Sequence, residues 1–579
     1  MPDFQNFERL DATGLVNVSQ LLSHAAKQVP EHLAVAVAGR HRSTTSAGHQ
    51  HEGREKPAPP GWRTISYQEL DTLATDIARG LLELGIPPGT RLALMVRPGI
   101  EFIALVFGLM RAGMVQVLID PGMGRHNMVQ CLQECDPQGF VGIPLAHVMR
   151  LVFRRKFPAA IYNVTVGRRY GWGGWTYQQV IAKGRPSIRE VNRTSASQQA
   201  AIIFTTGSTG PPKGVYYSHG MFIRQATLIR DFYSIQPGGV DLSGFPLFAL
   251  FNIGMGVTTV IPQMDPTRPA AVQPQRIIEA VELWRADQSF GSPALWNTVS
   301  TYCERRQIQL PSLKKVFSAG APVPPHVLRR LQKMISTDGE IYTPYGATES
   351  LPIASNSART ILNETSVLSA SGHGTCVGSR FPEIDWKVIE ITDLPLATME
   401  QVRELPRGEI GELMVSGPVV SPKYVTRMDA NALHKVVDSA TNAVWHRMGD
   451  VGYLDGQDRF WFCGRKGHRV VTARGTLFTI PIEAMINKHP EVYRSALVGI
   501  GPVGAQIPAM VLEPWPEHWS SNRARQSRLI DEVRQIAEQD PRSKQIQHYF
   551  VMKSLPVDIR HNAKIFREKL AKWAASKLK

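Results

Sequence analysis

Residues 202–219 read IIFTTGSTGPPKGVYYSH and carry the most specific signal in the chain. The apolar residues 200–204 predict a buried strand in front of a loop. Because glycine has no Cβ, the loop backbone can fold tightly around an anion and point its N–H groups at phosphate oxygens. Hydroxyl groups and one lysine add further donors. The candidate phosphate-binding residues are Thr205, Thr206, Gly207, Ser208, Thr209, Gly210 and Lys213.

This glycine-rich loop is not a Walker A loop. That motif places Gly-Lys-Ser/Thr four residues after its first glycine, whereas the corresponding position after Gly207 is occupied by Pro212, Lys213 and Gly214. An ordinary turn between two strands is the alternative interpretation. The remaining motifs of the chain decide between a turn and a polyphosphate cradle.

Length and composition indicate a soluble globular enzyme. The 579 residues suggest two to four domains, and 43% hydrophobic with 20% charged residues is ordinary for such a protein. The five cysteines form no CxxC pair, and the N-terminus is acidic without an apolar core. We therefore expect reduced thiols, no signal peptide and a cytoplasmic location.

The net charge of +16 favours anionic partners. We expect no nucleic-acid binding, because no basic tail, zinc-ligand spacing or RNA-binding motif accompanies this charge. A nucleotide, a phosphorylated carrier or a lipid surface explains it as well. Residues 150–175 combine six basic residues with several aromatic ones. A solvated basic loop is the preferred interpretation there, and docking of an acidic partner or a membrane is the alternative.

One uncharged run, residues 242–264, is long enough to be weighed as a membrane span. It contains Pro246, Gly254, Gly256 and Pro262, so it predicts a strand, a loop and a second strand, and we expect no transmembrane segment. Residues 41–61 are polar and rich in histidine, which indicates an exposed insertion rather than a metal site.

Helix and strand patterns alternate through the N-terminal region. Residues 65–85 predict a helix with Leu70, Leu73, Ile77 and Leu81 on one face, and the strand pattern RLALMV follows it. Residues 101–112 and 114–119 repeat this pair. Such alternation is typical of an α/β fold, in which helices cover the faces of a parallel sheet.

Three further motifs follow the loop: SAGAPV at 318–323, TPYGATES at 343–350 and WHRMGDVGYLDGQDRFWFCGR at 445–465. Together with the loop, they closely resemble the adenylate-forming superfamily of acyl-CoA synthetases, luciferases and adenylation domains. The resemblance extends from about residue 15 to residue 570. It implies a large N-terminal AMP-binding domain, residues 1–465, with parallel-sheet layers and a β subdomain. A small mobile C-terminal α/β lid domain, residues 466–579, would follow.

The resemblance also implies the roles of individual residues in binding ATP and Mg²⁺. The Tyr345 ring can stack on adenine, Thr348 would contact the α-phosphate, and the Glu349 carboxylate suits Mg²⁺. Asp450 would accept hydrogen bonds from both ribose hydroxyls, and Arg465 would reach ribose or phosphate. Besides the loop, the implied nucleotide-binding residues are Gly320, Ala321, Pro322, Tyr345, Gly346, Ala347, Thr348, Asp450, Arg465 and Lys564.

The lid carries the implied catalytic lysine in LPVDIRHNAKIFREKL, residues 555–570. A positive charge that a mobile domain brings between the α-phosphate and the carboxylate can neutralise charge that develops during adenylation. We assign this role to Lys564, with Thr348 as the second catalytic residue, whereas Arg567→Ala should have a much smaller effect. The apolar residues after Ile565 leave a peripheral membrane contact open, although packing within the small domain is the default interpretation.

Residues 245–256, FPLFALFNIGMG, resemble the family segment that walls the acid-substrate pocket. Many relatives carry histidine where this chain has Ala249. A small apolar side chain at this position should leave room for a bulky or long-chain acid. Phe290 and Ser292 lie in a second segment that is expected to form a wall of this pocket.

Two departures from the family pattern resemble one branch of the superfamily, the olefin-biosynthesis β-lactone synthetases. They are the IRHNAK motif of the lid and GRKGHRVVTARGTLF at the hinge. In the hinge segment Gly467 stands where relatives carry Asp or Lys, and Arg474 stands where relatives have a glycine that lines the tunnel for the thiol acceptor. The implied substrate is a long-chain β-hydroxy acid, which is adenylated by MgATP and then closes to a β-lactone with release of AMP. Assembly with other enzymes of the olefin pathway is also implied.

Two alternatives remain open at this point. A long-chain acyl-CoA synthetase shares every step up to the adenylate. A catalytically dead fold that acts as an assembly partner is disfavoured, because Glu349, Asp450, Arg465 and Lys564 are all retained.

Overall fold

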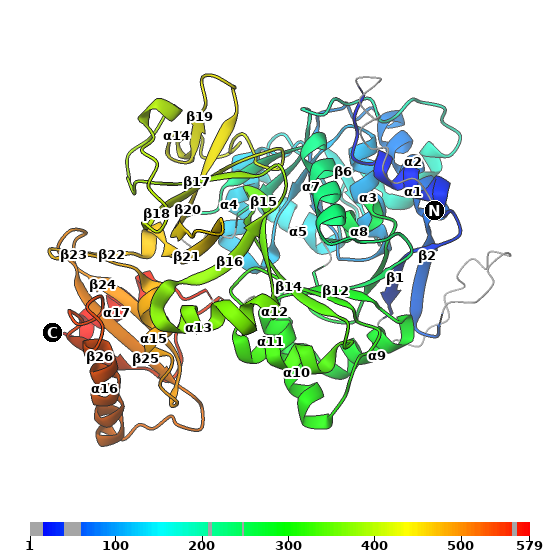
Figure 1. The fold of residues 1–579 in the computed structure, drawn as a ribbon. Helices are drawn as coiled ribbons and strands as arrows, with labels where there is room; N and C mark the ends of the chain where they lie inside the picture. Colours follow the sequence, from blue (N-terminus) through cyan, green and yellow to red (C-terminus); the bar gives the residue numbers. More distant parts are fainter. Residues whose placement is uncertain (1–14, 40–58, 206–210, 246–247, 559–563, 579) are drawn as a thin grey trace.

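The computed structural model describes residues 15–39, 59–205, 211–245, 248–558 and 564–578. Two large sheets lie side by side, and a small C-terminal domain, orange to red in Figure 1, lies beside the larger sheet. This architecture agrees with the predicted α/β class. Most of the expected insertion at 41–61 and the loop residues Thr206, Gly207, Ser208, Thr209 and Gly210 lie outside the described residues.

The seven-stranded sheet has the order β7-β6-β5-β3-β4-β8-β9, and all neighbouring pairs are parallel except β8 with β9. Its strands are β3 Arg91–Met95, β4 Val115–Leu118, β5 Gly139–Gly142, β6 Tyr162–Thr165, β7 Trp175–Thr176, β8 Gln199–Phe204 and β9 Gly214–Ser218. The helices in this part of the chain are α1 Gln20–Gln28, α2 Tyr67–Glu83, α3 Ile100–Arg111, α4 Arg125–Cys135, α5 Pro144–Val152, α6 Tyr177–Gly184 and α7 His219–Phe232.

The larger sheet has fourteen strands, thirteen of them in the order β17-β18-β20-β21-β16-β15-β14-β13-β12-β10-β11-β1-β2, with β19 paired to β20. The run from β14 to β1 is parallel, and the strands from β15 to β17 continue it as an antiparallel region. The strands of the parallel run and its edge are β1 Leu33–Ala38, β2 Trp62–Ser66, β10 Val240–Ser243, β11 Thr258–Ile261, β12 Gln288–Gly291, β13 Lys315–Ser318 and β14 Glu340–Ala347. The antiparallel strands are β15 Ser350–Ser357, β16 Thr375–Arg380, β17 Asp385–Ile389, β18 Gly411–Ser416, β19 Lys435–Val437, β20 Val444–Leu454 and β21 Arg459–Arg465.

The helices of this second part of the chain are α8 Ala249–Gly254, α9 Pro274–Trp284, α10 Pro293–Arg306, α11 Pro325–Met334, α12 Ala358–Thr360, α13 Ser366–Leu368 and α14 Asp429–His434. Helix α8 is a difference from the sequence expectation, because it occupies part of the span that was expected to be a loop between β10 and β11. Among the described residues, no helix combines the length and the apolar composition that a membrane crossing would need.

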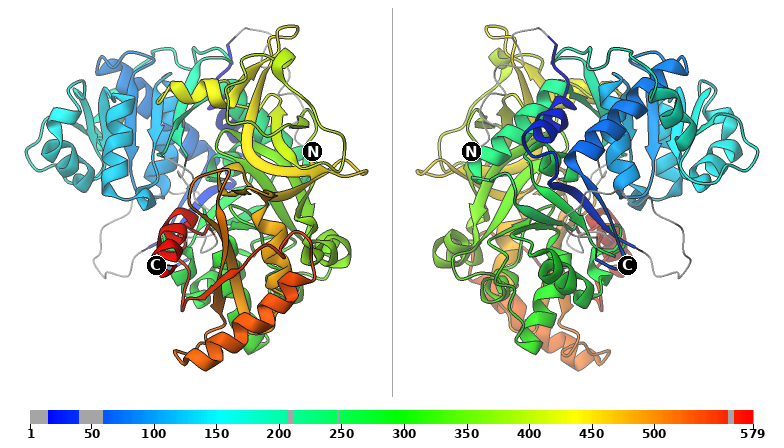
Figure 2. Two further views of the ribbon diagram at one scale, coloured as in Figure 1. Left: turned by 90° about the vertical axis from the view of Figure 1, so that its left-hand side faces the viewer. Right: turned by 90° about the vertical axis from the view of Figure 1, so that its right-hand side faces the viewer.

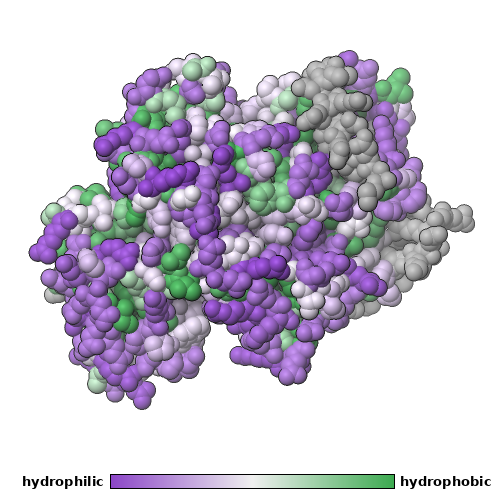
Figure 3. Space-filling model, in the orientation of Figure 1, coloured by the Kyte–Doolittle hydropathy of each residue, from purple (hydrophilic) through white to green (hydrophobic). Residues whose placement is uncertain are grey.

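Amphipathic patterns explain how these elements pack. Helix α2 buries Leu70, Ile77 and Leu81 as predicted, and Ser66 and Glu69 form a capping box at its first turn. The largest apolar core joins both sheets, since it contains Val215 of β9 and Phe317 of β13. A second core lies where α9, α10 and α11 cover the larger sheet. On the face shown in Figure 3, hydrophilic side chains predominate and hydrophobic ones form small groups between them.

The C-terminal domain has a three-stranded sheet, a separate two-stranded sheet and two apolar cores. Its strands are β22 Val470–Thr472, β23 Gly475–Leu477, β24 Val492–Ile500, β25 Ile507–Pro514 and β26 His548–Val551, and its helices are α15 Thr479–Ile486, α16 Arg523–Glu538 and α17 Arg567–Lys577. Successive residues of β24 face opposite sides. Leu497 therefore packs in the core that includes α16, whereas Ala496 and Val498 pack in the core that includes α17.

Candidate active site

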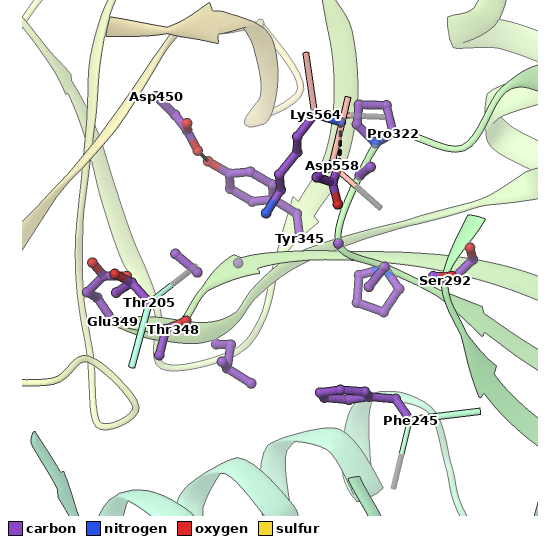
Figure 4. Close-up of a pocket in the computed structure, with 18 of the residues that line it drawn as sticks. Thr205, Phe245, Ser292, Pro322, Tyr345, Thr348, Glu349, Asp450, Asp558 and Lys564 are labelled. Atoms are coloured by element: carbon purple, nitrogen blue, oxygen red, sulfur yellow. Dashed lines mark hydrogen bonds between the residues drawn. The ribbon is translucent and has the colours of Figure 1, made fainter. Parts of the chain in front are cut away.

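One cavity of about 1810 Å³ brings together residues from every motif of the sequence. It is larger than a pocket for a drug-sized ligand usually is, and the close-up in Figure 4 shows side chains that converge on it from separate strands and loops. The predicted site residues that line it are Thr205, Lys213, Gly320, Ala321, Pro322, Tyr345, Gly346, Ala347, Thr348, Glu349, Asp450, Arg465 and Lys564.

The base of the phosphate loop is closed by hydrogen bonds between Thr205 and Lys213. The Thr205 backbone N–H donates to the Lys213 carbonyl at 3.0 Å, and the Lys213 N–H donates to the Thr205 hydroxyl at 3.0 Å. Strands β8 and β9 pair up to Phe204 and Gly214, directly below these residues. The hairpin therefore holds both ends of the loop at one point of the cavity wall.

The amine of Lys213 contacts the side chain of His434, which lies 221 residues further along the chain. His434, the last residue of α14, places its Nδ1 3.3 Å from the Arg447 carbonyl oxygen and its Nε2 3.2 Å from Lys213 Nζ. A carbonyl can only accept, so Nδ1 carries the ring proton and Nε2 accepts from the lysine. Burial and the nearby Lys213 charge lower the pKa of His434 to about 3, which keeps the ring neutral.

Two more side chains surround this lysine. The Tyr424 ring contacts two lysines, since the Nζ atoms of Lys213 and Lys435 lie 5.1 and 5.4 Å from its centroid. Lys435 donates to the Ser421 carbonyl at 2.6 Å, and burial lowers its pKa to about 7. Lys213 therefore lines the cavity with its amine against a neutral ring nitrogen and an aromatic face.

The residues around Glu349 fit a magnesium ion that accompanies a nucleotide. The Tyr424 hydroxyl donates to Glu349 Oε1 at 2.6 Å, and the Ser421 N–H donates to the Glu349 carbonyl at 2.8 Å. Among the described residues, no group of three histidine, cysteine or acidic side chains could hold a metal. A single fixed carboxylate suits Mg²⁺, which usually takes one or two protein carboxylates together with water and substrate phosphates.

Asp450 lies in β20 and is almost fully buried. Its Oδ2 accepts from the Tyr345 hydroxyl at 2.5 Å, and its Oδ1 accepts from Arg465 Nη1 at 2.7 Å. Burial and the adjacent Asp450 charge raise the pKa of Tyr345 well above its usual value, so the phenol remains a donor. Figure 4 shows Tyr345 and Asp450 joined in this way beside Lys564.

The wall predicted to contact adenine is built from the ends of two parallel strands. The chain leaves β13 at Ser318 and turns at Gly320, whose φ of 96° is in the left-handed region that favours glycine. Tyr345 and Gly346 lie on the neighbouring strand β14, and Thr348 lies in the turn after it. The Tyr217 hydroxyl donates to the Thr348 carbonyl at 2.5 Å, which fixes this turn against β9.

Lys564 enters the cavity from the C-terminal domain. Its backbone N–H donates to Asp558 Oδ1 at 2.8 Å, and its side chain points toward Tyr345 in Figure 4. Thr479 and Phe566 of the same domain also line the cavity. The small domain thus forms one wall of the site in this arrangement.

The other end of the cavity is apolar. Ile229, Phe245, Phe248, Phe251, Met255, Phe290 and Phe317 line it, and the Phe248 and Phe290 rings stack with centroids 4.0 Å apart. Asp241 lies deeper along β10, where it accepts from Asn252 at 2.8 Å, and burial raises the pKa of its carboxyl to about 7. Ser292 lies on the wall near Phe245 (Figure 4).

Ala249 does not line this cavity, in contrast to the sequence expectation. Its side chain is buried in the apolar core at the first turn of α8, and the neighbouring Phe248 faces the cavity instead. The space for the acid substrate at this end of the cavity therefore depends on how α8 is placed relative to β10 and β12.

The sequence did not indicate a role for Tyr424, His434, Lys435 or Asp558. Tyr424, His434 and Lys435 lie outside the motifs identified in the sequence. The signal of Tyr424 and His434 is spatial, since they contact Glu349 and Lys213 only after distant strands are assembled, whereas Asp558 lies in the lid motif itself, six residues before Lys564.

Comparisons with known proteins agree with this geometry. A family model described as AMP-binding enzyme matches residues 43–425. The chain is 43% identical to an olefin beta-lactone synthetase of Stenotrophomonas maltophilia (strain K279a) over 569 residues, which are 97% of this chain and 98% of that protein. It is 42% identical over 566 residues to the olefin beta-lactone synthetase of Xanthomonas campestris pv. campestris, with the same shares covered. The ATP-bound MatB from Rhodopseudomonas palustris has the same fold, with a TM-score of 0.74 at 19% identity over 97% of this chain and 100% of that chain.

Proposed function

We propose that this chain, which belongs to the AMP-binding enzyme family, catalyses a ligase reaction in two steps. MgATP first activates a long-chain β-hydroxy carboxylic acid to an acyl adenylate with release of pyrophosphate. The β-hydroxyl of the same molecule then attacks the activated carbonyl, which gives a β-lactone and AMP. The observation that carries this outcome is the identity of 42–43% to two olefin beta-lactone synthetases over 97% of the chain.

The residues of the polar end have distinct tasks in the first step. Lys213 and Thr205 would bind the phosphates, Glu349 would hold Mg²⁺, which neutralises charge on the phosphate oxygens when bound, and Asp450 would bind the ribose. Lys564 would donate to the oxygens where negative charge grows as the carboxylate attacks the α-phosphate. Its position on the small domain supports this role, because a lysine that enters with the lid can be withdrawn after adenylation.

The second step needs no further substrate. The hydroxyl oxygen forms a bond to the carbonyl carbon, the bond from that carbon to the AMP oxygen breaks, and the hydroxyl proton is released. Because nucleophile and electrophile belong to one molecule, positioning can contribute up to about 7–11 kcal/mol against the barrier. Part of this contribution offsets the strain of the four-membered ring. Gly467 at the hinge and Arg474 at the expected position of a tunnel glycine support a route without an external thiol.

The apolar end of the cavity supports a substrate with long alkyl chains, since seven apolar or aromatic side chains line it. We further propose that residues 466–579 move as a lid against residues 1–465. The protein is also proposed to act in the cytoplasm and to assemble with other enzymes of olefin biosynthesis, which would supply the β-hydroxy acid and consume the lactone. A peripheral membrane contact of the lid helix, suggested by its apolar residues after Ile565, also remains a proposal.

The test combines the purified protein with MgATP and a long-chain β-hydroxy acid in the absence of CoA. Mass spectrometry should detect a product lighter than the acid by one water, with AMP and pyrophosphate in equal amounts. The same acid without its β-hydroxyl should stop at the acyl adenylate. Lys564→Ala should retain ATP binding by calorimetry and lose pyrophosphate release in a single turnover, whereas Lys572→Ala, at an exposed lysine of α17, should retain both.

Two outcomes would contradict the proposal. A requirement for CoA with a thioester product would establish the acyl-CoA synthetase instead. Equal turnover of acids with and without the β-hydroxyl would exclude lactone formation as the second step.

A further inference from the structure

Residues 137–189 form an unusual segment of this chain. They contain nine lysine and arginine residues and no aspartate or glutamate. The segment includes α5, β6, β7 and α6 at one edge of the seven-stranded sheet. In both views of Figure 2 the cyan part of the chain projects from the side of the molecule.

Large apolar side chains are exposed at the same place. Leu145, Val148 and Val152 are 70%, 45% and 69% exposed, and their spacing of three and four residues puts them on one face of α5. Leu151 and Phe153 extend this exposed surface toward the end of the helix. Contiguous exposed apolar surface usually marks a binding site rather than a tolerated defect.

The buried side of α5 is anchored firmly. His147 is fully buried, its Nε2 lies 3.0 Å from the Val164 carbonyl of β6, and its ring stacks on Trp172 at 5.7 Å. Burial lowers the pKa of His147, which keeps this contact uncharged. These contacts fix the orientation of α5, so that its apolar face is exposed.

Basic side chains follow this face directly. Arg154, Arg155 and Lys156 form the short helix η3 Arg154–Lys156, and all three are exposed. In the described part of the chain none of the three forms an ion pair, although other exposed arginines do, such as Arg185 with Asp76. Their charges are thus available to an anionic partner.

We propose that α5 and η3 form a docking surface for an anionic lipid bilayer. The surface consists of Leu145, Val148, Leu151, Val152, Phe153, Arg154, Arg155 and Lys156. An apolar helix face that enters the boundary between headgroups and acyl chains, with basic residues beside it, is the pattern of proteins that lie on membranes. Aliphatic side chains on a projecting helix favour a fluid bilayer over an acidic protein, which would need matched polar partners at its rim. This inference does not depend on the identity of the reaction.

The experiment measures flotation of the full-length protein with vesicles, in the absence of ATP and acid. Wild type should bind vesicles of 70% phosphatidylcholine and 30% phosphatidylglycerol, and bind phosphatidylcholine vesicles at least about fivefold more weakly, because each basic residue near an anionic surface contributes about that factor. Arg154→Glu with Arg155→Glu should abolish the preference for the anionic vesicles. Leu145→Glu with Val152→Glu should reduce binding to both vesicle types.

Matched controls separate the surface from general effects of charge. Leu394→Glu with Val503→Glu alters two apolar residues that are each 71% exposed, and Arg523→Glu with Arg525→Glu makes the same charge change on α16. Both should bind like wild type, and unchanged thermal melting verifies that every variant is folded. The proposal is overturned if wild type does not bind anionic vesicles, if the control variants lose binding equally, or if an acidic protein binds this surface while vesicles do not.

Discussion

At the scale of single residues, Asp450 has a structural partner that its motif does not reveal. Its carboxylate already accepts hydrogen bonds from the Tyr345 hydroxyl and from Arg465. The same group that is expected to bind ribose therefore also orients the ring that is expected to stack on adenine. Removing it should disturb both contacts.

Asp450→Ala should weaken ATP binding about 10- to 100-fold, because hydrogen bonds to a charged group contribute about 1.5–3 kcal/mol. Tyr345→Phe keeps the aromatic ring and removes only the hydroxyl, so its effect should be about tenfold at most. Isothermal titration calorimetry measures both variants. Unchanged ATP affinity in Asp450→Ala would exclude the assigned role of this carboxylate.

His434 is the second residue whose task depends on position. We expect His434→Leu to raise the KM for ATP about 2- to 12-fold with little change in kcat, because the lost contact to Lys213 contributes about 0.5–1.5 kcal/mol and concerns binding of the phosphates. His434→Gln retains an acceptor and should recover most of the loss. A purely structural role would instead lower the melting temperature of both variants and leave KM unchanged.

At the scale of elements, the buried ion pair between α17 and α15 defines the small domain. Arg567 donates to both carboxylate oxygens of Glu483 and to the Leu497 carbonyl, and Glu483 also accepts from the Leu497 N–H. These contacts join α15, β24 and α17. Arg567 is therefore a structural residue. Its removal should have the small effect on catalysis that the sequence predicts and, in addition, a large effect on the stability of the domain.

Arg567→Ala should lower the free energy of unfolding of the C-terminal domain by about 3–5 kcal/mol, because it leaves Glu483 buried without its partner. The matched control is Arg534→Ala, which removes an exposed ion pair with Asp531 and should cost less than about 1 kcal/mol. Urea unfolding monitored by limited proteolysis of the full chain compares the two. Equal losses in both variants would mean that the pair does not hold the domain together.

The contact between β10 and α8 predicts a dependence of stability on pH. Burial raises the pKa of Asp241 to about 7, above its value in the unfolded chain. The folded state then binds this proton more tightly, so the wild type loses stability as pH rises from about 4 to about 7. Asp241→Asn should remove this loss, which amounts to a few kcal/mol at about 1.4 kcal/mol per pKa unit.

Thermal melting between pH 5 and pH 8 measures this effect. The stabilisation of Asp241→Asn relative to wild type should be greater at pH 8 than at pH 5. Asp231→Asn, at an exposed position of α7, should show no such trend. A constant difference between Asp241→Asn and wild type across this range would contradict the assignment.

At the scale of the whole molecule, hydrogen bonds and ion pairs join the small domain to the large one. Arg542 donates to the carbonyls of Ser371 and Gly372 in η7 Ser369–His373, and Lys466 donates to Glu412 Oε2 at 3.0 Å. The first contact lies far from the hinge in sequence. It is therefore suited to hold the lid in the arrangement that places Lys564 in the cavity.

Arg542→Ala should slow adenylate formation several-fold in a single turnover, because one or two hydrogen bonds of about 0.5–1.5 kcal/mol no longer favour this arrangement. ATP affinity should change little, since the nucleotide contacts belong to the large domain. Arg528→Ala, which removes an ion pair within the small domain, is the control. A loss of ATP binding in Arg542→Ala would contradict a movement of residues 466–579 as a lid.

Local sequence patterns determined much of this protein. In residues 65–119, apolar residues at helix spacing alternate with strand patterns. This alternation predicted α2, β3, α3 and β4, because the apolar face of each element must be buried. The glycine-rich loop and the motifs around Tyr345 and Asp450 predicted residues that line one cavity. These features depend on neighbours within a few residues, so they are legible without the fold.

Only the tertiary structure decided the features that depend on residues far apart in the chain. The contact of Lys213 with His434, the orientation of Ala249 into the core and the pairing of Arg567 with Glu483 follow from how helices and strands pack, and no short motif encodes them. The exposed face of α5 is of the same kind. From periodicity alone, its apolar residues would be expected to be buried. They are exposed because the helix lies at the edge of the sheet and packs its other side against β6.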